Sequence, residues 1–172
     1  MAFRSGQWRK PQKAAPSVQE ARLLLEGWCA RAERSPRQVR DKLRRLNVPR
    51  EQWDDHLEHL RAEGYQDDLR FARAYVNDHL FLQHWGPEKI RYGLRIEAID
   101  EGKASQALAA VADADWLAAL EKVLRQRLGE PPYPRLDPEA YGGLLRFVLQ
   151  RGFTSPQLKT TLEAGRVDPT AV

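Results

Sequence analysis

The sequence predicts an all-α protein made of three tandem three-helix repeats that form an elongated, curved array. Two observations predict it: no stretch alternates apolar and polar residues as a half-buried strand does, and the sequence repeats itself at an interval of 51 residues. The repeated columns are Pro36/Pro87/Pro138, Val39/Ile90/Tyr141, Leu43/Leu94/Leu145 and Arg44/Arg95/Arg146. A period of this length is typical of stacked supersecondary units, which present long surfaces and therefore favour binding over catalysis.

The predicted organisation is a basic disordered arm at 1–16, three-helix repeats at 17–64, 65–112 and 113–164, and a frayed tail at 165–172. A proline-rich loop at 130–138 interrupts the third repeat. A unit of about 50 residues is marginal for burying a core by itself, so neighbouring repeats are expected to pack on each other.

The first repeat shows how local sequence starts and stops each helix. Ser17 is expected to cap the first helix, and Glu20 completes a capping box. Ser35 caps the second helix, and Pro36 fits its first turn because the N–H that proline lacks would have no partner there. Asn47 is expected to end that helix in the left-handed conformation, and a third helix completes the repeat.

The second and third repeats follow the same plan. Asp67 or Asp68 caps the next helix, and Gly86-Pro87 opens the one after it. The residues that follow the three middle helices are Val48, Ile99 and Phe153, at intervals of 51 and then 54 residues. The longer second interval predicts that the middle helix of the third repeat is about one turn longer than the others.

The composition is that of a soluble globular protein, with 42% apolar and 30% charged residues. No apolar run approaches the ~18 residues needed to span a bilayer, and the polar N-terminus lacks the apolar segment of a signal peptide. Cys29 is the only cysteine, which excludes an intrachain disulfide. A reducing cytoplasm is therefore the expected location.

The net charge of +4 comes from the N-terminal arm, because the rest of the chain balances 24 acidic side chains with as many basic ones. The candidate DNA-binding residues of the arm are Arg4, Trp8, Arg9, Lys10 and Lys13. A basic arm with an aromatic side chain suits phosphates and unpaired bases. A solvated tail is the alternative interpretation.

The sequence offers little for catalysis or metal binding. His56 and His59 lie three residues apart among carboxylates, but no cysteine or third histidine accompanies them. The sequence also lacks a glycine-rich phosphate loop and a serine nucleophile elbow. We therefore expect these histidines to be surface residues of an amphipathic helix, and we expect no enzyme activity, metal or cofactor.

Basic residues recur on the middle helices. Arg40 and Arg44 share a helix face, and Arg91 and Arg95 occupy the same columns in the second repeat. Arg146 keeps the second column in the third repeat. The candidate partner-binding residues are Arg37, Arg40, Arg44, Lys89, Arg91, Arg95, Arg146 and Arg151. Such a row can meet phosphates or an acidic protein groove, and a solvated helix face is the alternative.

Four runs of the chain resemble the RecX family of bacterial regulatory proteins: RSP at 34–36, GYQDDLRFA at 64–72, WGPEKIR at 85–91 and LQRGF at 149–153. The resemblance covers about residues 18–164. The family commonly has glycine after the middle helix, where this chain has Asn47 and Ala98.

The resemblance implies a negative regulator of homologous recombination and DNA repair. Family members bind in the groove of the RecA–DNA filament, bridge successive RecA subunits, and inhibit filament extension, ATP hydrolysis and strand exchange without a cofactor. The implied partner is the RecA filament; through the basic residues we also expect contact with single-stranded and double-stranded DNA, and no membrane. We expect a monomer.

Two other functions fit three-helix units with a basic middle helix. One is a DNA-binding regulator that uses a helix-turn-helix-like unit, although the basic residues recur across repeats and no dimerisation segment is visible. The other is a general helical adaptor for a different partner.

Overall fold

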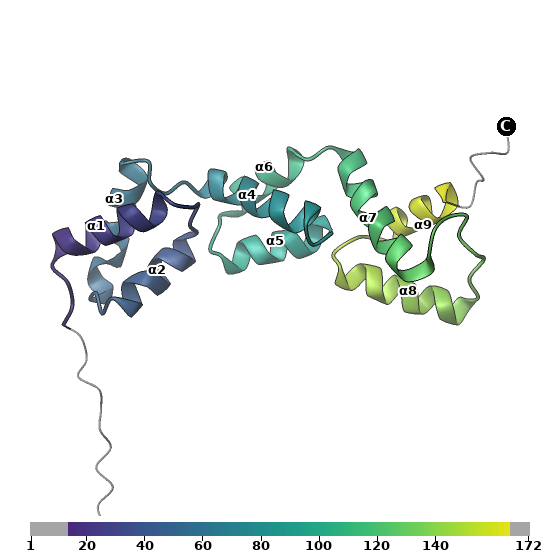
Figure 1. The fold of residues 1–172 in the computed structure, drawn as a ribbon, viewed down its shortest axis with the longest axis horizontal. Helices are drawn as coiled ribbons and strands as arrows, with labels where there is room; N and C mark the ends of the chain where they lie inside the picture. The colour runs from purple at the N-terminus through teal and green to yellow at the C-terminus, as the bar shows by residue number, and fades with distance from the viewer. Residues whose placement is uncertain (1–13, 166–172) are drawn as a thin grey trace, which may run out of the picture. The chain divides into compact units, whose positions relative to one another are not determined.

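The computed structural model describes residues 14–165, and over that range the protein is all-helical, without strands (Figure 1). The α-helices are α1 (Val18–Cys29), α2 (Pro36–Arg45), α3 (Trp53–Ala62), α4 (Asp68–Phe81), α5 (Pro87–Ile96), α6 (Glu101–Ala109), α7 (Asp113–Leu128), α8 (Pro138–Gln150) and α9 (Ser155–Ala164). A short 3₁₀ helix, η1 (Arg50–Gln52), precedes α3. The three predicted repeats correspond to α1–α3, α4–α6 and α7–α9, which confirms the all-α repeat fold.

The chain divides into two compact units between Gln66 and Asp67. In unit 1, helices α1–α3 enclose one cluster of buried side chains, formed by Ala21, Leu25, Cys29, Val39, Leu43, Val48, Leu57 and Leu60. In unit 2, α4–α9 share a larger cluster that includes Phe71, Leu94, Trp116, Leu124, Val148 and Phe153. The second and third repeats thus pack around one core. The predicted domain boundaries remain a prediction, and residues 1–13 of the arm and 166–172 of the tail lie outside the described residues.

Helix caps form largely where the sequence predicts them. The Ser17 and Ser35 side chains each complete a capping box, at the starts of α1 and α2. Asp67 caps α4, since its carboxylate accepts a hydrogen bond of 2.7 Å from the Arg70 N–H. Asp68 is instead buried and bonds Lys103 Nζ at 2.7 Å, so it ties α4 to α6.

The three middle helices end in the same way. The residue in the left-handed conformation is Asn47 after α2 (φ 59°), Ala98 after α5 (φ 62°) and Gly152 after α8 (φ 87°). The following N–H bonds back to the helix in each case, from Val48 to the Leu43 carbonyl, from Ile99 to that of Leu94 and from Phe153 to that of Val148. These are Schellman ends, and they define which residues are equivalent between repeats.

This equivalence corrects the register of the third repeat. As predicted, α8 is longer, with 13 residues where α2 and α5 have 10 each. The extra residues lie at its start, so Leu144 and Val148 fill the buried positions, whereas Tyr141 and Leu145 are only partly buried. The predicted columns through Tyr141, Leu145 and Arg146 are therefore wrong. Pro138 misled the alignment because proline suits the first turn of any helix.

The second and third repeats meet through their backbones. The Gly86 N–H, at the start of α5, donates to the Arg151 carbonyl at 2.6 Å, and the Glu88 N–H donates to that of Gly152 at 3.1 Å. A Cβ on Gly86 would overlap the Gly152 backbone, and one on Gly152 would overlap the backbone of Lys89. Only residues without side chains fit this close approach.

Candidate functional site

The repeated arginines lie on the middle helices of the first two repeats, α2 and α5. The shared helix ends make Arg40 equivalent to Arg91, and Arg44 equivalent to Arg95. Arg40 and Arg91 are partly buried, whereas Arg44 and Arg95 are exposed. We therefore call Arg40 and Arg91 the inner pair, and Arg44 and Arg95 the outer pair.

The inner pair connects each middle helix to the third helix of its repeat. Arg40 Nη2 lies 3.4 Å from Asp54 Oδ1 of α3. Arg91 Nη1 donates to Ser105 Oγ of α6 at 2.8 Å and to the Glu101 carboxylate. Asp54 and Ser105 are themselves 51 residues apart. Both inner arginines thus contact the third helix of their own repeat. The Arg91 contacts are close, whereas the Arg40–Asp54 pair is long and exposed and contributes little free energy.

The outer pair is turned to solvent. The Arg44 side chain is 68% exposed, and its Nη2 lies 2.8 Å from Asp41 Oδ1. Arg37 Nε is 3.7 Å from the other oxygen of Asp41. Arg95 forms no ion pair with any residue of the described range, and its guanidinium lies 5.1 Å from the centroid of the Tyr92 ring. Because exposed ion pairs contribute little free energy, the Asp41 contact leaves Arg44 able to bind an external anion.

The third repeat does not continue the outer pair. Leu149, which is 49% exposed, occupies the position equivalent to Arg44 and Arg95. Arg146 is exposed on α8, but at the position equivalent to Tyr92. The arginine predicted to recur in all three repeats therefore recurs only in the first two.

Lys89 and Arg151 belong to the joint between the second and third repeats. Lys89 Nζ lies 4.1 Å from the centroid of the Trp85 ring. Arg151 Nη1 donates to the Gln83 carbonyl at 3.2 Å, and its guanidinium lies 5.2 Å from the Phe147 ring centroid. Burial, together with the positive charge of Arg151, lowers the pKa of Lys89. Their contacts identify both residues as parts of the joint.

The five predicted residues of the arm, Arg4, Trp8, Arg9, Lys10 and Lys13, lie outside the described residues. Their role in DNA binding stays a prediction.

The two histidines of α3 differ from the surface residues that the sequence predicts. His56 is buried, at 2% exposure, and neither ring nitrogen has a hydrogen-bond partner in the described structure. His59 Nε2 lies 2.7 Å from Glu26 Oε1. No group of three or more metal-ligating side chains occurs within residues 14–165. The prediction missed the burial of His56 because it treated the histidine as part of the charged face. His56 lies four residues before Leu60 and beside Leu57, on the buried face of α3.

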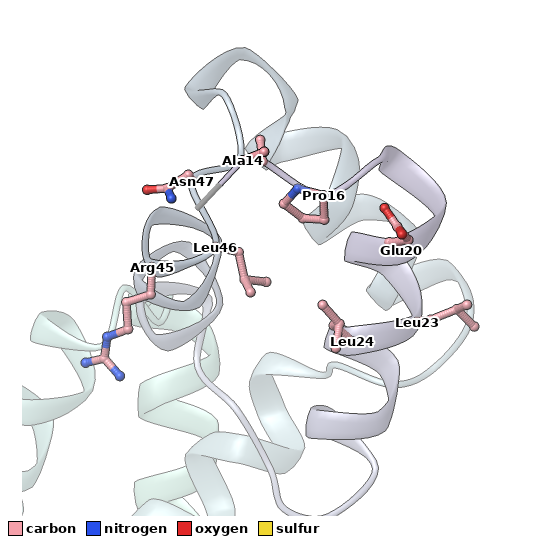
Figure 2. A pocket seen from close by; sticks show the side chains of 9 residues that line it. Ala14, Pro16, Glu20, Leu23, Leu24, Arg45, Leu46 and Asn47 are labelled. Carbon is pink, nitrogen blue, oxygen red and sulfur yellow. The ribbon is translucent and has the colours of Figure 1, made fainter. Parts of the chain in front are cut away.

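A hollow of about 640 Å³ in unit 1 is lined mainly by apolar side chains, among them Leu23, Leu24 and Leu46. Leu24 of α1 and Leu46 after α2 face into it, whereas Arg45 points away (Figure 2). Two polar residues lie at its edge. The Glu20 carboxylate completes the capping box of α1, and Asn47 ends α2 in the left-handed conformation. The hollow therefore offers a nonpolar surface and no constellation for catalysis.

Sequence reasoning missed an exposed apolar stripe on α5. Tyr92 is 55% exposed and Ile96 is 45% exposed, beside Arg95. The sequence could have indicated that Tyr92 and Ile96 are exposed, because both lie off the helix face that the buried Ile90 and Leu94 mark.

None of the helices between residues 14 and 165 is long and apolar enough to cross a membrane.

The second repeat matches a known protein family. The family model described as "RecX, second three-helix domain" matches residues 67–108. This range covers α4 and α5 and most of α6.

Two curated relatives match nearly the whole chain. The "Regulatory protein RecX" of Acidithiobacillus ferrooxidans is 32% identical over 155 residues, which cover 90% of this chain and 93% of that protein. The protein of the same name from Halorhodospira halophila is 30% identical over 156 residues, which cover 90% and 92%.

Two solved structures share the fold. The crystal structure of RecX from Lactobacillus salivarius matches with a TM-score of 0.70 and 19% identity, over 85% of this chain and 94% of that chain. A second crystal structure, of regulatory protein RecX, matches with a TM-score of 0.73 and 20% identity, over 84% and 72%.

Proposed function

This chain belongs to the RecX family of regulatory proteins, and we propose that it is a negative regulator of homologous recombination and DNA repair. In this proposal the protein acts in the cytoplasm as a monomer. It binds in the groove of the RecA–DNA filament and inhibits filament extension, ATP hydrolysis and strand exchange. Inhibition requires that the protein bind the non-extending state of the filament more tightly than the active state.

The outer pair is the observation that carries this proposal. Arg44 and Arg95 occupy equivalent positions on two helices, and both are exposed. A polymer offers the same chemical group repeatedly, so a repeated cation on the binding protein suits it. The inner pair is less exposed than the outer pair and contacts the third helix of its own repeat. We therefore assign contact with the filament to the outer pair, assisted by Arg37 and Arg146.

The test removes the outer pair and measures inhibition. The double variant Arg44→Ala/Arg95→Ala should need at least about tenfold more protein to inhibit DNA-dependent ATP hydrolysis by RecA, because two exposed cations at a charged interface are lost. The control is Arg73→Ala/Arg127→Ala, which removes the same charge from exposed positions of α4 and α7. Co-sedimentation with RecA filaments on single-stranded DNA measures binding in parallel.

Three outcomes distinguish the possibilities. Loss of inhibition by the outer-pair variant but not by the control supports the proposal. Equal losses in both variants would show that only net charge matters and would remove the outer pair from the site. Failure of the unmodified protein to co-sediment with RecA filaments overturns the proposed function, and strong sequence preference on duplex DNA would favour a DNA-binding regulator instead.

The arm is proposed to add affinity for DNA that does not depend on sequence. Such a contribution falls steeply as salt increases, because bound cations release counterions from the phosphates. Removal of residues 1–13 should therefore reduce the salt dependence of binding to naked single-stranded DNA.

A further inference from the structure

The outward stripe of α5 differs in chemistry from the equivalent stripe of the first repeat. Tyr92 and Ile96 are the exposed apolar members of this stripe, and Arg95 lies between them in sequence. The Schellman ends make Tyr92 equivalent to Asp41 and Ile96 equivalent to Arg45. The second repeat thus exposes an aromatic and an aliphatic side chain where the first has two charged ones, of which Arg45 is exposed and Asp41 is partly buried.

The surroundings of Tyr92 make it a preorganised anchor. Arg95 lies against its ring, with 5.1 Å between the guanidinium carbon and the ring centroid. Tyr92 and Arg95 also line a shallow hollow of about 260 Å³ with Glu88, Arg91 and Glu101. A tyrosine has few rotatable bonds, so fixing it in a complex costs little conformational entropy. Tyrosine and arginine are the side chains that most often dominate protein interfaces.

The charges around the hollow favour a protein partner over a nucleic acid. Glu88 and Glu101 offset Arg91 and Arg95, so the rim as a whole is neutral. Phosphates gain little from a neutral rim, because nucleic-acid binding depends on excess positive charge. An apolar centre with a mixed polar rim is instead the usual composition of a protein–protein contact.

The guanidinium of Arg95 indicates a second property of the partner. Arg91 bonds the Glu101 carboxylate and Ser105, whereas Arg95 has no ion pair among residues 14–165. We propose that the α5 stripe, formed by Tyr92, Arg95 and Ile96, docks on a protein surface that presents an apolar side chain beside a carboxylate. This inference rests on the proposed function, in which that protein surface belongs to the filament and not to its DNA.

The experiment measures two affinities for each full-length variant. One is for RecA filaments formed on single-stranded DNA with a non-hydrolysable ATP analogue, and the other is for the same DNA without RecA. Tyr92→Ala should weaken filament binding at least about tenfold, and Ile96→Ala should weaken it by a smaller factor. Both should bind naked DNA within about twofold of the unmodified protein, since no cation is removed.

Two further variants serve as controls. Tyr92→Phe keeps the ring and should bind the filament within about twofold of the unmodified protein. Leu82→Ala removes an apolar side chain that is 76% exposed elsewhere in unit 2, and filament binding should not change. Circular dichroism and thermal unfolding verify that each variant is folded, which is expected for exposed positions.

The outcomes separate this inference from the proposed function. If the unmodified protein binds filaments and Tyr92→Ala and Ile96→Ala bind equally well, the inference is overturned and the proposed function stands. If Tyr92→Ala weakens binding to naked DNA by the same factor, the stripe is a nucleic-acid surface and the inference is again overturned. If the unmodified protein does not bind filaments, both fail.

Discussion

Unit 1 folds its three helices around a core of its own, whereas in unit 2 two repeats share one core and join through their backbones. The difference is visible at equivalent positions of the third helices. His56 of α3 corresponds to Ala107 of α6 and to Thr161 of α9, and all three are buried. Ala107 is apolar, and the Thr161 hydroxyl donates to the Gln157 carbonyl at 2.9 Å. Of these three positions, only the one in unit 1 holds a titratable side chain, and its ring nitrogens have no hydrogen-bond partner among the described residues.

This comparison shows that a repeat in sequence is not necessarily a unit of stability. Isolated three-helix cores are small, and a shared core removes more apolar surface from water for each residue. Unit 2 gains that advantage through the glycine contact that lets its repeats approach. We therefore expect unit 1 to be the less stable part of the protein and unit 2 to depend strongly on its joint.

The largest expected effect comes from breaking the joint. Gly152→Ala should destabilise unit 2 by about 3 kcal/mol or more, because the residue has φ 87° and its new methyl group would overlap the Lys89 backbone. Gly143→Ala is the matched control in α8: a Cβ there meets nothing within 4 Å. That control should stabilise the helix by about 0.5–1 kcal/mol. Chemical denaturation monitored by circular dichroism measures both, and an equal response of the two variants would contradict the role of the joint.

The helices and their ends could be predicted from the sequence because capping is local chemistry. Ser17, Ser35 and Asn47 act within one turn of their own positions, so their neighbours in sequence are sufficient to identify them. Ala98 is a harder case, since alanine rarely adopts a positive φ. It does so here because the adjoining Ile99 is buried and its N–H completes the helix end.

The site could be predicted only in part, because its roles depend on contacts between helices. The spacing identified Arg40 and Arg44 as neighbours on one face, but only the structure shows that Arg40 reaches Asp54 and Arg44 does not. The register of the third repeat failed for a related reason: a helix extended at its start keeps its proline and shifts its buried face. Local sequence patterns determine where a helix begins and ends, whereas packing between helices determines which of its side chains are accessible to a partner.

The second expected effect is a dependence of unit 1 on pH. Burial is the main cause that lowers the pKa of His56 from the ordinary 6.5; electrostatic interactions with Arg22 and His59 lower it further, and Asp55 opposes them. Below pH 6.5 the unfolded chain binds a proton that the folded unit excludes, so stability falls as pH falls towards the lowered pKa. The slope is at most about 1.4 kcal/mol per pH unit for one group.

Hydrogen exchange measures this dependence for each unit separately, after correction for the intrinsic effect of pH. Amides of α1–α3 should lose protection on mild acidification more than those of α4–α9. His56→Leu fills the site with an apolar side chain and should remove most of the difference between the units. If the variant retains the same pH slope in α1–α3, another group is responsible.

The smallest expected effect is an absence of change, and it tests whether the two units are independent. Cys29 lies in the core of unit 1, and burial raises its pKa from 9.0 to about 11. Because the thiolate is the reactive form, alkylation of the folded protein at mildly alkaline pH should require opening of unit 1.

Gly152→Ala weakens only unit 2, so it should leave the labelling rate of Cys29 within about twofold. Leu57→Ala in the unit 1 core should increase that rate at least about tenfold, since such a truncation costs about 2–5 kcal/mol. Acceleration by Gly152→Ala as large as that by Leu57→Ala would mean that the two cores open together, and that the boundary at Gln66 does not divide the protein energetically.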